Sequence, residues 1–293
     1  MAEAGNINWY PGHMKKATRM MEENLRLVDA VAEIRDARIP ESSRNPDIDR
    51  IAAGMPRLII LNRADQADPA VTAEWSRALT GGGAAALEMD CKSGKGVGAF
   101  PAAARNLLSE LIERSRAKGK VGRPLRFMVL GIPNVGKSSF INRLAGRKAA
   151  QTSDRPGVTR GKQWISLPNN IQLLDTPGIL WPKFESEQVG LALAWTGAIN
   201  DNILDIEHVA SALLERMREL YPGAIEERYK FSPEPGVPGY EMLEQAGRKR
   251  GFLISGGEVN TERMARVLLE EYRSCRLGHF SLEMPPAKGE DHD

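Results

Sequence analysis

The sequence predicts an α/β protein with a doubly wound, mostly parallel sheet, followed by a smaller all-helical domain. Up to about residue 185, short apolar runs typical of buried strands alternate with stretches of helical periodicity. Beyond Ser186 the strand pattern disappears, and helical periodicity continues at 205–220, 240–248 and 261–273. No apolar run reaches the roughly eighteen residues of a membrane span, so we expect no membrane partner.

The elements are expected in a simple order. A first helix follows residues 9–14, because Met14, Ala17, Met21, Leu25 and Val28 recur at helical spacing. Strands are expected at 30–34, 57–61, 86–89, 127–130, 164–167 and 171–174, and helices at 69–79 and 97–115. A basic stretch at about 113–126, with glycines and a proline, reads as an exposed linker. We therefore expect domains at 1–185 and 186–283, with a disordered polar tail at 284–293.

Composition narrows the function classes. The chain has 293 residues and two cysteines, which excludes a disulfide framework and a four-cysteine zinc site. No secretory leader is visible, so we expect a cytoplasmic protein, or a mitochondrial-matrix one if the chain is organellar. Lys and Arg predominate in residues 1–200, whereas Asp and Glu predominate in 201–293. The basic part is either a polyanion-binding surface or an ordinary solvated one.

The strongest motif lies at 131–138, where two glycines with four residues between them precede Lys and Ser. Glycines let backbone N–H groups turn towards phosphate oxygens, and the helix that follows favours an anion at its start. Lys137 brings charge to the β- and γ-phosphates, and the Ser138 hydroxyl suits Mg²⁺. A Gly-rich turn that binds nothing is the alternative. The pattern predicts a nucleoside triphosphate site comprising Asn134, Val135, Gly136, Lys137, Ser138 and Ser139.

A site that binds the nucleobase is expected earlier in the chain. Asp65 follows a strand end, where its carboxylate can accept two N–H bonds from guanine, which adenine does not offer. Asn62 can tie this loop to the phosphate loop, and the stem of Arg63 can cover the ring. A backbone N–H at Cys91 or Lys92 can read the guanine O6 atom. On its own, Asn-x-x-Asp is also typical of an ordinary strand-end turn.

With Thr159, Asp175 and Gly178, these segments resemble the five signature boxes of a P-loop GTPase, with the base boxes placed before the phosphate loop. A circular permutation explains the order, because domain termini lie close together. The chain is similar to the circularly permuted GTPases, and most of all to the ribosome biogenesis GTPase A group. The resemblance rests on WYPGHM at 9–14, DARIPESSRNP at 36–46, GIPNVGKSS at 131–139, PGVTR at 156–160, DTPG at 175–178 and GRKRG at 247–251. Arg63 departs from the usual Lys, and Asp90-Cys91-Lys92 from the usual Ser-Ala-Lys.

The resemblance implies a GTP-hydrolysing factor that binds the large ribosomal subunit precursor through rRNA and leaves after hydrolysis. Asp175 would hold Mg²⁺ through its water shell, the Gly178 N–H would meet the γ-phosphate, and Thr159 would close over both. Ile179 stands where Ras-like GTPases have Gln, so hydrolysis by the isolated protein should be slow and stimulated by the ribosomal particle. His13 resembles the family's proposed catalytic histidine, and Asn134 its K⁺-associated residue. The expected catalytic set is His13, Lys137, Thr159 and Gly178, although His13 can equally be structural.

The helical domain supplies candidate RNA contacts. They are basic residues in the 247–251 motif and on one face of the 261–273 helix: Arg248, Lys249, Arg250, Arg263, Arg266 and Arg273. A solvated basic face is the alternative. Three other functions stay open: a non-catalytic GTP-dependent placeholder, a permuted GTPase of the small subunit, and a metabolic ATPase with a different base site. We expect a monomer.

Overall fold

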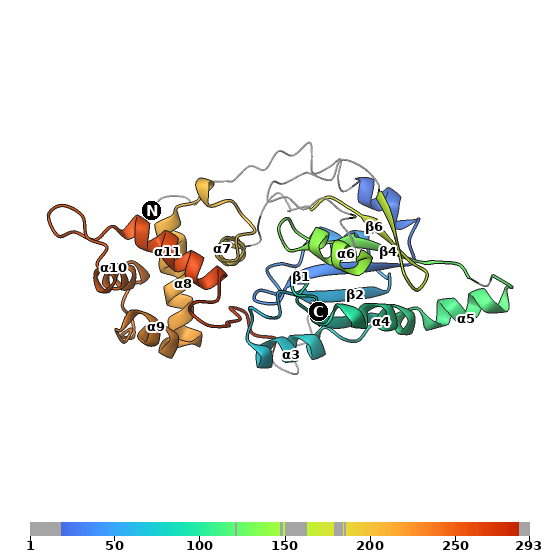
Figure 1. The fold of residues 1–293 in the computed structure, drawn as a ribbon, viewed down its shortest axis with the longest axis horizontal. Coiled ribbons are helices and arrows are strands. Elements are labelled where there is room, and N and C mark those ends of the chain that lie inside the picture. Colours follow the sequence, from blue (N-terminus) through green and yellow to red (C-terminus); the bar gives the residue numbers. More distant parts are fainter. Residues whose placement is uncertain are drawn as a thin grey trace. The chain divides into compact units, whose positions relative to one another are not determined.

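The computed structural model describes residues 19–120, 122–146, 149, 163–178, 184 and 186–286. The chain divides into two compact units (Figure 1): residues 1–184 together with 283–293, and residues 185–282. Most of the tail expected at 284–293 lies outside the described residues. None of the described helices is both long and apolar enough to cross a membrane.

The first unit is built on a six-stranded sheet with the strand order β3-β2-β1-β4-β6-β5. The strands are β1 (Ala30–Asp36), β2 (Arg57–Asn62), β3 (Ala84–Met89), β4 (Leu125–Leu130), β5 (Gln163–Leu167) and β6 (Ile171–Asp175). All neighbouring strands are parallel except β5, which runs antiparallel to β6 at the edge. The mostly parallel α/β fold predicted from the sequence is therefore confirmed.

The order of the strands fixes the place where a ligand can bind. The chain builds outwards from β1 to β2 and β3, returns to the centre at β4, and then builds outwards through β6 to β5. Strand order therefore reverses between the neighbours β1 and β4. In open α/β sheets, ligands bind at the carboxyl ends of the strands at such a switch point. The phosphate loop follows β4 directly at this point.

Helices cover both faces of this sheet, and two adjacent residues of β4 show why. Neighbouring side chains of a strand point to opposite faces. Phe127 makes an edge-to-face contact with Phe100 of α4 (Phe100–Leu107), which also meets Phe140 of α6 (Lys137–Ala145). Met128 packs on the other face against the 19–25 helix and α2 (Pro46–Ile51). Another helix, α3 (Pro69–Ala78), buries Trp75 against β2.

The single helix expected at 97–115 is divided in the structure. It consists of the short turn η1 (Val97–Ala99), then α4, then α5 (Ser109–Ala117). Leu108 lies between α4 and α5 with non-helical backbone angles. The helix therefore continues into the stretch expected to be a linker, and α5 ends only at Ala117.

The second unit is helical. It contains α7 (Glu187–Trp195), η2 (Asp201–Ile203), α8 (Ile206–Leu220), α9 (Pro222–Tyr229), α10 (Gly239–Lys249) and α11 (Thr261–Arg273). Leucine and methionine side chains of α8, α10 and α11 form its buried centre. Gly239 is required where α10 begins, because a Cβ there would lie 2.3 Å from the Ser211 carbonyl oxygen of α8. The loop after α10 exposes Leu253 and Ile254.

Candidate functional site

The phosphate loop is shaped by glycines that no other residue could replace without a clash. Gly131 has a φ of +148°, and a Cβ there would lie 2.6 Å from the Ile34 carbonyl oxygen. Gly136 has a φ of +105°, and its Cβ would lie 2.2 Å from the side-chain nitrogen of Asn62. Between them Asn134 also has a positive φ, of 58°. Such left-handed conformations turn successive N–H groups to one side, which creates an anion-binding nest at the start of α6.

Lys137, the first residue of α6, is a buried cation held inside this loop. Its Nζ donates hydrogen bonds to the carbonyl oxygens of Gly131 at 3.0 Å and Ile132 at 2.6 Å. Burial lowers the pKa of Lys137 to about 8, although Asp175 acts in the opposite direction. Burial also raises the pKa of Asp175, against the attraction of Lys137. The loop therefore contains a desolvated positive charge that an anionic ligand would stabilise.

The 175–178 segment is bonded to β4 and passes close to the phosphate loop. The Thr176 hydroxyl donates a 2.5 Å hydrogen bond to the carbonyl oxygen of Val129 in β4. A Cβ at Gly178 would lie 2.5 Å from the Lys137 Nζ and 2.9 Å from the Pro133 Cα. The glycine therefore allows the backbone to pass directly over the phosphate loop. The expected contact between the Gly178 N–H and a γ-phosphate stays a prediction.

The residues near Lys137 suit Mg²⁺. Mg²⁺ prefers oxygen ligands and is usually held by one or two protein groups together with substrate phosphates and water. The Ser138 hydroxyl in the first turn of α6 and the Asp175 carboxylate at the end of β6 are such groups. No cluster of three His, Cys, Asp or Glu side chains forms a metal site among the described residues. The donor set therefore fits an ion shared with phosphates.

Asn62 joins the base loop to the phosphate loop. Its side-chain N–H donates a 2.8 Å hydrogen bond to the Val135 carbonyl oxygen, and its side-chain oxygen accepts the Cys91 N–H at 3.1 Å. Arg63, with a φ of 61°, donates to the Asn134 carbonyl oxygen at 2.7 Å. Residues more than seventy positions apart are thus held together at the carboxyl ends of β2, β3 and β4.

Asp65, the carboxylate expected to recognise guanine, is exposed beyond the end of β2. Its charge reaches Cys91: the pKa of the Cys91 thiol is raised to about 12, mainly by burial and in part by Asp90 and Asp65. Cys91 is thus a protonated, unreactive thiol at neutral pH. The Asp65 carboxylate therefore interacts electrostatically with the loop after β3, which contains Cys91.

Asp90 explains how the second base box can depart from the usual Ser-Ala-Lys. Its Oδ1 accepts the N–H groups of Lys92 at 2.8 Å and Ser93 at 3.1 Å, so the carboxylate organises the turn. Burial opposes the charged form of Asp90, but hydrogen bonds from Ser93 and Lys92 keep its pKa below the ordinary value. The Lys92 and Cys91 N–H groups are both engaged within the protein. Reading guanine O6 would require one of them to be shared or released.

Sequence reasoning did not identify Arg143, which lies on α6. Its guanidinium donates to the carbonyl oxygens of Cys91, at 3.3 Å, and Lys92. The helix that begins with Lys137 therefore also supports the base loop. No local sequence pattern indicates this role, because the contact joins segments about fifty residues apart.

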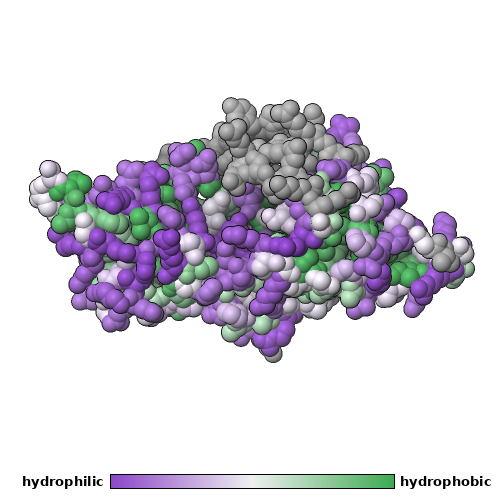
Figure 2. All heavy atoms as spheres, in the orientation of Figure 1, coloured by the Kyte–Doolittle hydropathy of each residue, from purple (hydrophilic) through white to green (hydrophobic). Residues whose placement is uncertain are grey.

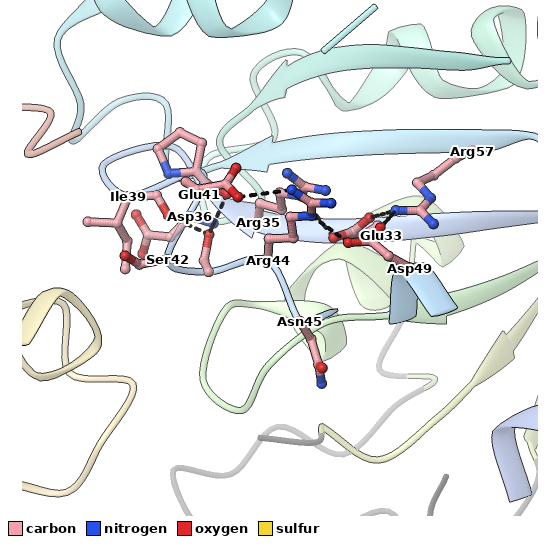
Figure 3. A network of polar contacts seen from close by, with 12 residues as sticks. Glu33, Arg35, Asp36, Ile39, Glu41, Ser42, Arg44, Asn45, Asp49 and Arg57 are labelled. Atoms are coloured by element: carbon pink, nitrogen blue, oxygen red, sulfur yellow. Dashed lines mark hydrogen bonds and ion pairs between the residues drawn. The ribbon is translucent and has the colours of Figure 1, made fainter. Parts of the chain in front are cut away.

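A polar network joins β1, the loop after it, α2 and β2 (Figure 3). Glu33 pairs with Arg35 at 2.8 Å and with Arg57 at 2.9 Å, and Asp49 pairs with both Arg57 and Arg44. These pairs bind the loop and α2 to the neighbouring strands.

Asp36 extends this network towards the base loop. It forms a two-point pair with the buried Arg38, at 2.9 and 2.7 Å, and lies 3.8 Å from Arg63. Although burial opposes it, Arg38 and Arg63 hold the pKa of Asp36 below its usual value. Further along the loop, the N–H groups of Glu41 and Ser42 donate to the carboxylate of Glu283. The 36–46 motif therefore positions Arg63, which in turn contacts the phosphate loop.

Two predicted site residues, His13 and Thr159, lie outside the described residues, as does Ile179. The structure brings the remaining residues of the nucleotide site to one edge of the sheet. Ser138 and Ser139 are half-buried in the first turn of α6, and Val135 is buried.

The six basic residues of the helical unit have different environments. Arg250, together with Arg228 and the Tyr229 hydroxyl, binds the buried Glu271, and Arg273 forms a two-point pair with Asp201 at 2.8 Å. Arg250 and Arg273 therefore hold this unit together.

The other four lie at the surface. Arg248 and Arg266 pair with glutamates one helical turn earlier. The Arg263 guanidinium lies 4.3 Å from the centre of the Phe252 ring, and Lys249 is exposed. Surface pairs of this kind are weak, so these residues are the more accessible to a polyanion.

Known proteins resemble both the sequence and the fold. A family model described as a 50S ribosome-binding GTPase matches residues 126–226. Ribosome biogenesis GTPase A of Priestia megaterium is 48% identical over 282 residues, covering 95% of this chain and 97% of the relative. The Thermotoga maritima protein of the same name is 33% identical over 281 residues, covering 95% of each. A crystal structure of GNP-bound YlqF from T. maritima superimposes with a TM-score of 0.61 at 28% identity, covering 92% of this chain and 98% of that one.

Proposed function

Because this chain belongs to the ribosome biogenesis GTPase A family, we propose that it binds and hydrolyses GTP while attached to an immature large ribosomal subunit. In this proposal it contacts the particle through rRNA and leaves after hydrolysis. It works as a monomer in the cytoplasm. The curated relatives carry the name ribosome biogenesis GTPase A, and the matching family model is described as 50S ribosome-binding.

The observation that carries the proposal is the hydrogen bond from Asn62 to the Val135 carbonyl oxygen. It joins Asn62 to a residue of the 131–138 loop that comes 73 residues later, which supports assigning 62–65 as a guanine box of the same site. One nucleotide can therefore be held at both ends, its base by Asp65 and its phosphates by the 131–138 loop. Hydrogen bonds to a charged group contribute about 1.5–3 kcal/mol each, so a carboxylate that adenine leaves unpaired favours guanine strongly.

In this proposal, catalysis depends on positive charge and N–H groups that face the phosphate oxygens. Lys137 would exchange its bonds to the Gly131 and Ile132 carbonyl oxygens for bonds to phosphate, and the Gly178 N–H would face the terminal phosphate. Ser138 and Asp175 would hold Mg²⁺, which offsets the charge of the phosphates when it is bound. We propose that Thr159 closes over this site in the GTP state.

The attacking water needs a separate partner. Position 179 is Ile, which has no polar atom to orient water. We propose His13 for this task, with a K⁺ ion at Asn134 supplying additional positive charge. Hydrolysis is then slow until the ribosomal particle completes the site. The same apolar residue favours the second candidate, a placeholder in which the nucleotide sets only the affinity for the particle.

The test is co-sedimentation with purified large-subunit precursors and with small ribosomal subunits, in GDP and in a non-hydrolysable GTP analogue. The proposal expects the protein to travel with large-subunit precursors in the analogue and to be released in GDP. Co-sedimentation with the small subunit alone would overturn it. Multiple-turnover GTP hydrolysis with the same particles distinguishes the enzyme from the placeholder, since a placeholder would show no stimulation.

A further inference from the structure

A basic cavity lies at the opposite end of the sheet from the phosphate loop. Its volume is about 210 Å³, and its lining includes Arg105, Ile112, Arg116, Lys120, Arg123 and Asn170. These residues surround the beginning of β4, whereas the phosphate loop follows the end of that strand. The cavity is therefore separate from the nucleotide site and belongs to the stretch that sequence analysis treated as a linker.

Gly119 creates one wall of the cavity by ending α5 in a specific turn. It has a φ of +70°, and its N–H donates to the Arg116 carbonyl oxygen while the Lys120 N–H donates to that of Ser115. These two bonds form a Schellman motif, in which a left-handed glycine reverses the chain at a helix end. The reversal brings Lys120 to the same cavity as Arg116 of the last helical turn.

The turn between β5 and β6 forms the other wall and is held by three hydrogen bonds. Asn170 donates to the Gly122 carbonyl oxygen at 2.9 Å and accepts the Leu125 N–H at 3.0 Å. Arg105 of α4 donates to the Asn169 carbonyl oxygen at 3.0 Å. The cavity is therefore built from fixed backbone rather than from loose surface loops.

The charged residues that line the cavity are all positive. Four of the described lining residues are Arg or Lys, and none is Asp or Glu. Arg105 is engaged with Asn169, and Arg123 pairs with Asp29 at 2.6 Å. The side chains of Arg116 and Lys120 contact no acceptor among the residues that the structure describes. Both side chains are exposed and line the same cavity, so a phosphate group held there can pair with both.

We propose that this cavity binds a phosphate of an RNA backbone, through Arg116 and Lys120. The inference rests on the proposed function in taking RNA as the ligand, and it adds a contact site in the first unit to the candidates in the helical one.

Figure 2 shows that the α5 end of the first unit is mostly hydrophilic, with small apolar areas. The basic side chains there are exposed to solvent, as phosphate binding requires.

The test compares two double variants of the full chain, Arg116→Gln with Lys120→Gln, and Arg114→Gln with Lys118→Gln. Both remove two positive charges from the same stretch, but Arg114 and Lys118 do not line the cavity. A labelled oligouridine serves as the probe, with its affinity measured across a chloride series. Losing the one phosphate that Arg116 and Lys120 hold should reduce the slope of log affinity against log salt by about 0.7 and lower affinity on the order of tenfold. The Arg114/Lys118 control should change little.

Several outcomes would overturn the proposal. Equal losses in the two variants would indicate only a general charge effect. Unchanged RNA affinity in the Arg116/Lys120 variant would exclude the cavity, as would binding of inorganic phosphate there without any effect on RNA. A third variant, Lys249→Gln with Arg263→Gln, separates this result from the proposed function: if it alone weakens RNA binding, the proposed function stands and the cavity does not. GDP affinity and thermal stability, which should match the wild type, show that each variant is folded.

Discussion

The side-chain N–H of Asn62 donates a 2.8 Å hydrogen bond to the carbonyl oxygen of Val135, which lies 73 residues later in the chain. This contact makes the base loop and the phosphate loop parts of one site. The same Asn62 accepts the Cys91 N–H, so three segments depend on a single amide. Because its two hydrogen bonds are buried, neither water nor a neighbouring side chain can replace them without rearrangement.

Replacing Asn62 with Ala should therefore weaken GTP and GDP binding together. A lost hydrogen bond that leaves a buried partner unsatisfied costs about 1–3 kcal/mol, which corresponds to roughly 5- to 150-fold in affinity. Equilibrium titration with a fluorescent GDP analogue measures the change. Asn106→Ala, on the exposed surface of α4, is the control and should leave affinity unchanged. Wild-type affinity in Asn62→Ala would show that the link does not support the site.

Lys137 should make the stability of the nucleotide-free protein depend on pH. Burial lowers its pKa in the folded protein to about 8, below the ordinary value of 10.5. Between those two pH values the unfolded chain binds more protons, so the stability of the folded state rises as pH rises. Relative to Lys137→Met, the wild type should gain up to about 3 kcal/mol from pH 8 to pH 10.5. If the unfolding free energies of the wild type and Lys137→Met changed equally with pH, a buried charged lysine would be contradicted.

His13→Ala should slow GTP hydrolysis while GTP affinity stays at the wild-type level. The reason is that a group orienting water acts in the chemical step and does not hold the nucleotide. Single-turnover hydrolysis and equilibrium binding, measured side by side, separate the two effects. His208→Ala in α8 is the matched control and should change neither. Loss of nucleotide binding in His13→Ala would instead indicate a structural histidine.

Hydrolysis should be faster in K⁺ than in Na⁺ at equal ionic strength, if an ion at Asn134 stabilises the charge that develops on the phosphates. Asn134→Gly keeps the positive φ of this position without strain and removes the side-chain oxygen. This variant should lose the difference between the two salts. Equal rates in both salts for the wild type would remove the ion from the mechanism.

Local patterns predicted the elements that carry regular periodicity or a phosphate motif. The helix at 261–273 has the predicted bounds, since its apolar residues repeat on one face and Asn260 caps its start. The strands were placed within a few residues, because each is a short buried apolar run. The order of the motifs also indicated the permutation, and β4 does lie at the centre of the sheet.

Other elements lacked a local signal. The helix α7 is apolar on most sides, so it has no amphipathic stripe, and α9 begins with Pro222-Gly223, which resembles a turn. The six-residue α2 is too short to show helical periodicity, although Asn45 caps it. The break at Leu108 involves neither Gly nor Pro. Arg143 could not be found for a different reason: its role depends on tertiary contacts with the loop after β3, which no local periodicity reveals.

The nucleotide specificity of Asp65→Asn tests most directly whether one pocket holds the base and the phosphates. A carboxylate accepts two N–H bonds from guanine, whereas an amide offers one acceptor and one donor, which match the N1–H and C2 carbonyl of xanthine. Competition titrations should show GTP affinity falling by about a hundredfold or more and XTP affinity rising, with phosphate binding at Lys137 retained. Unchanged preference for GTP over XTP in Asp65→Asn would show that the base does not lie at Asp65.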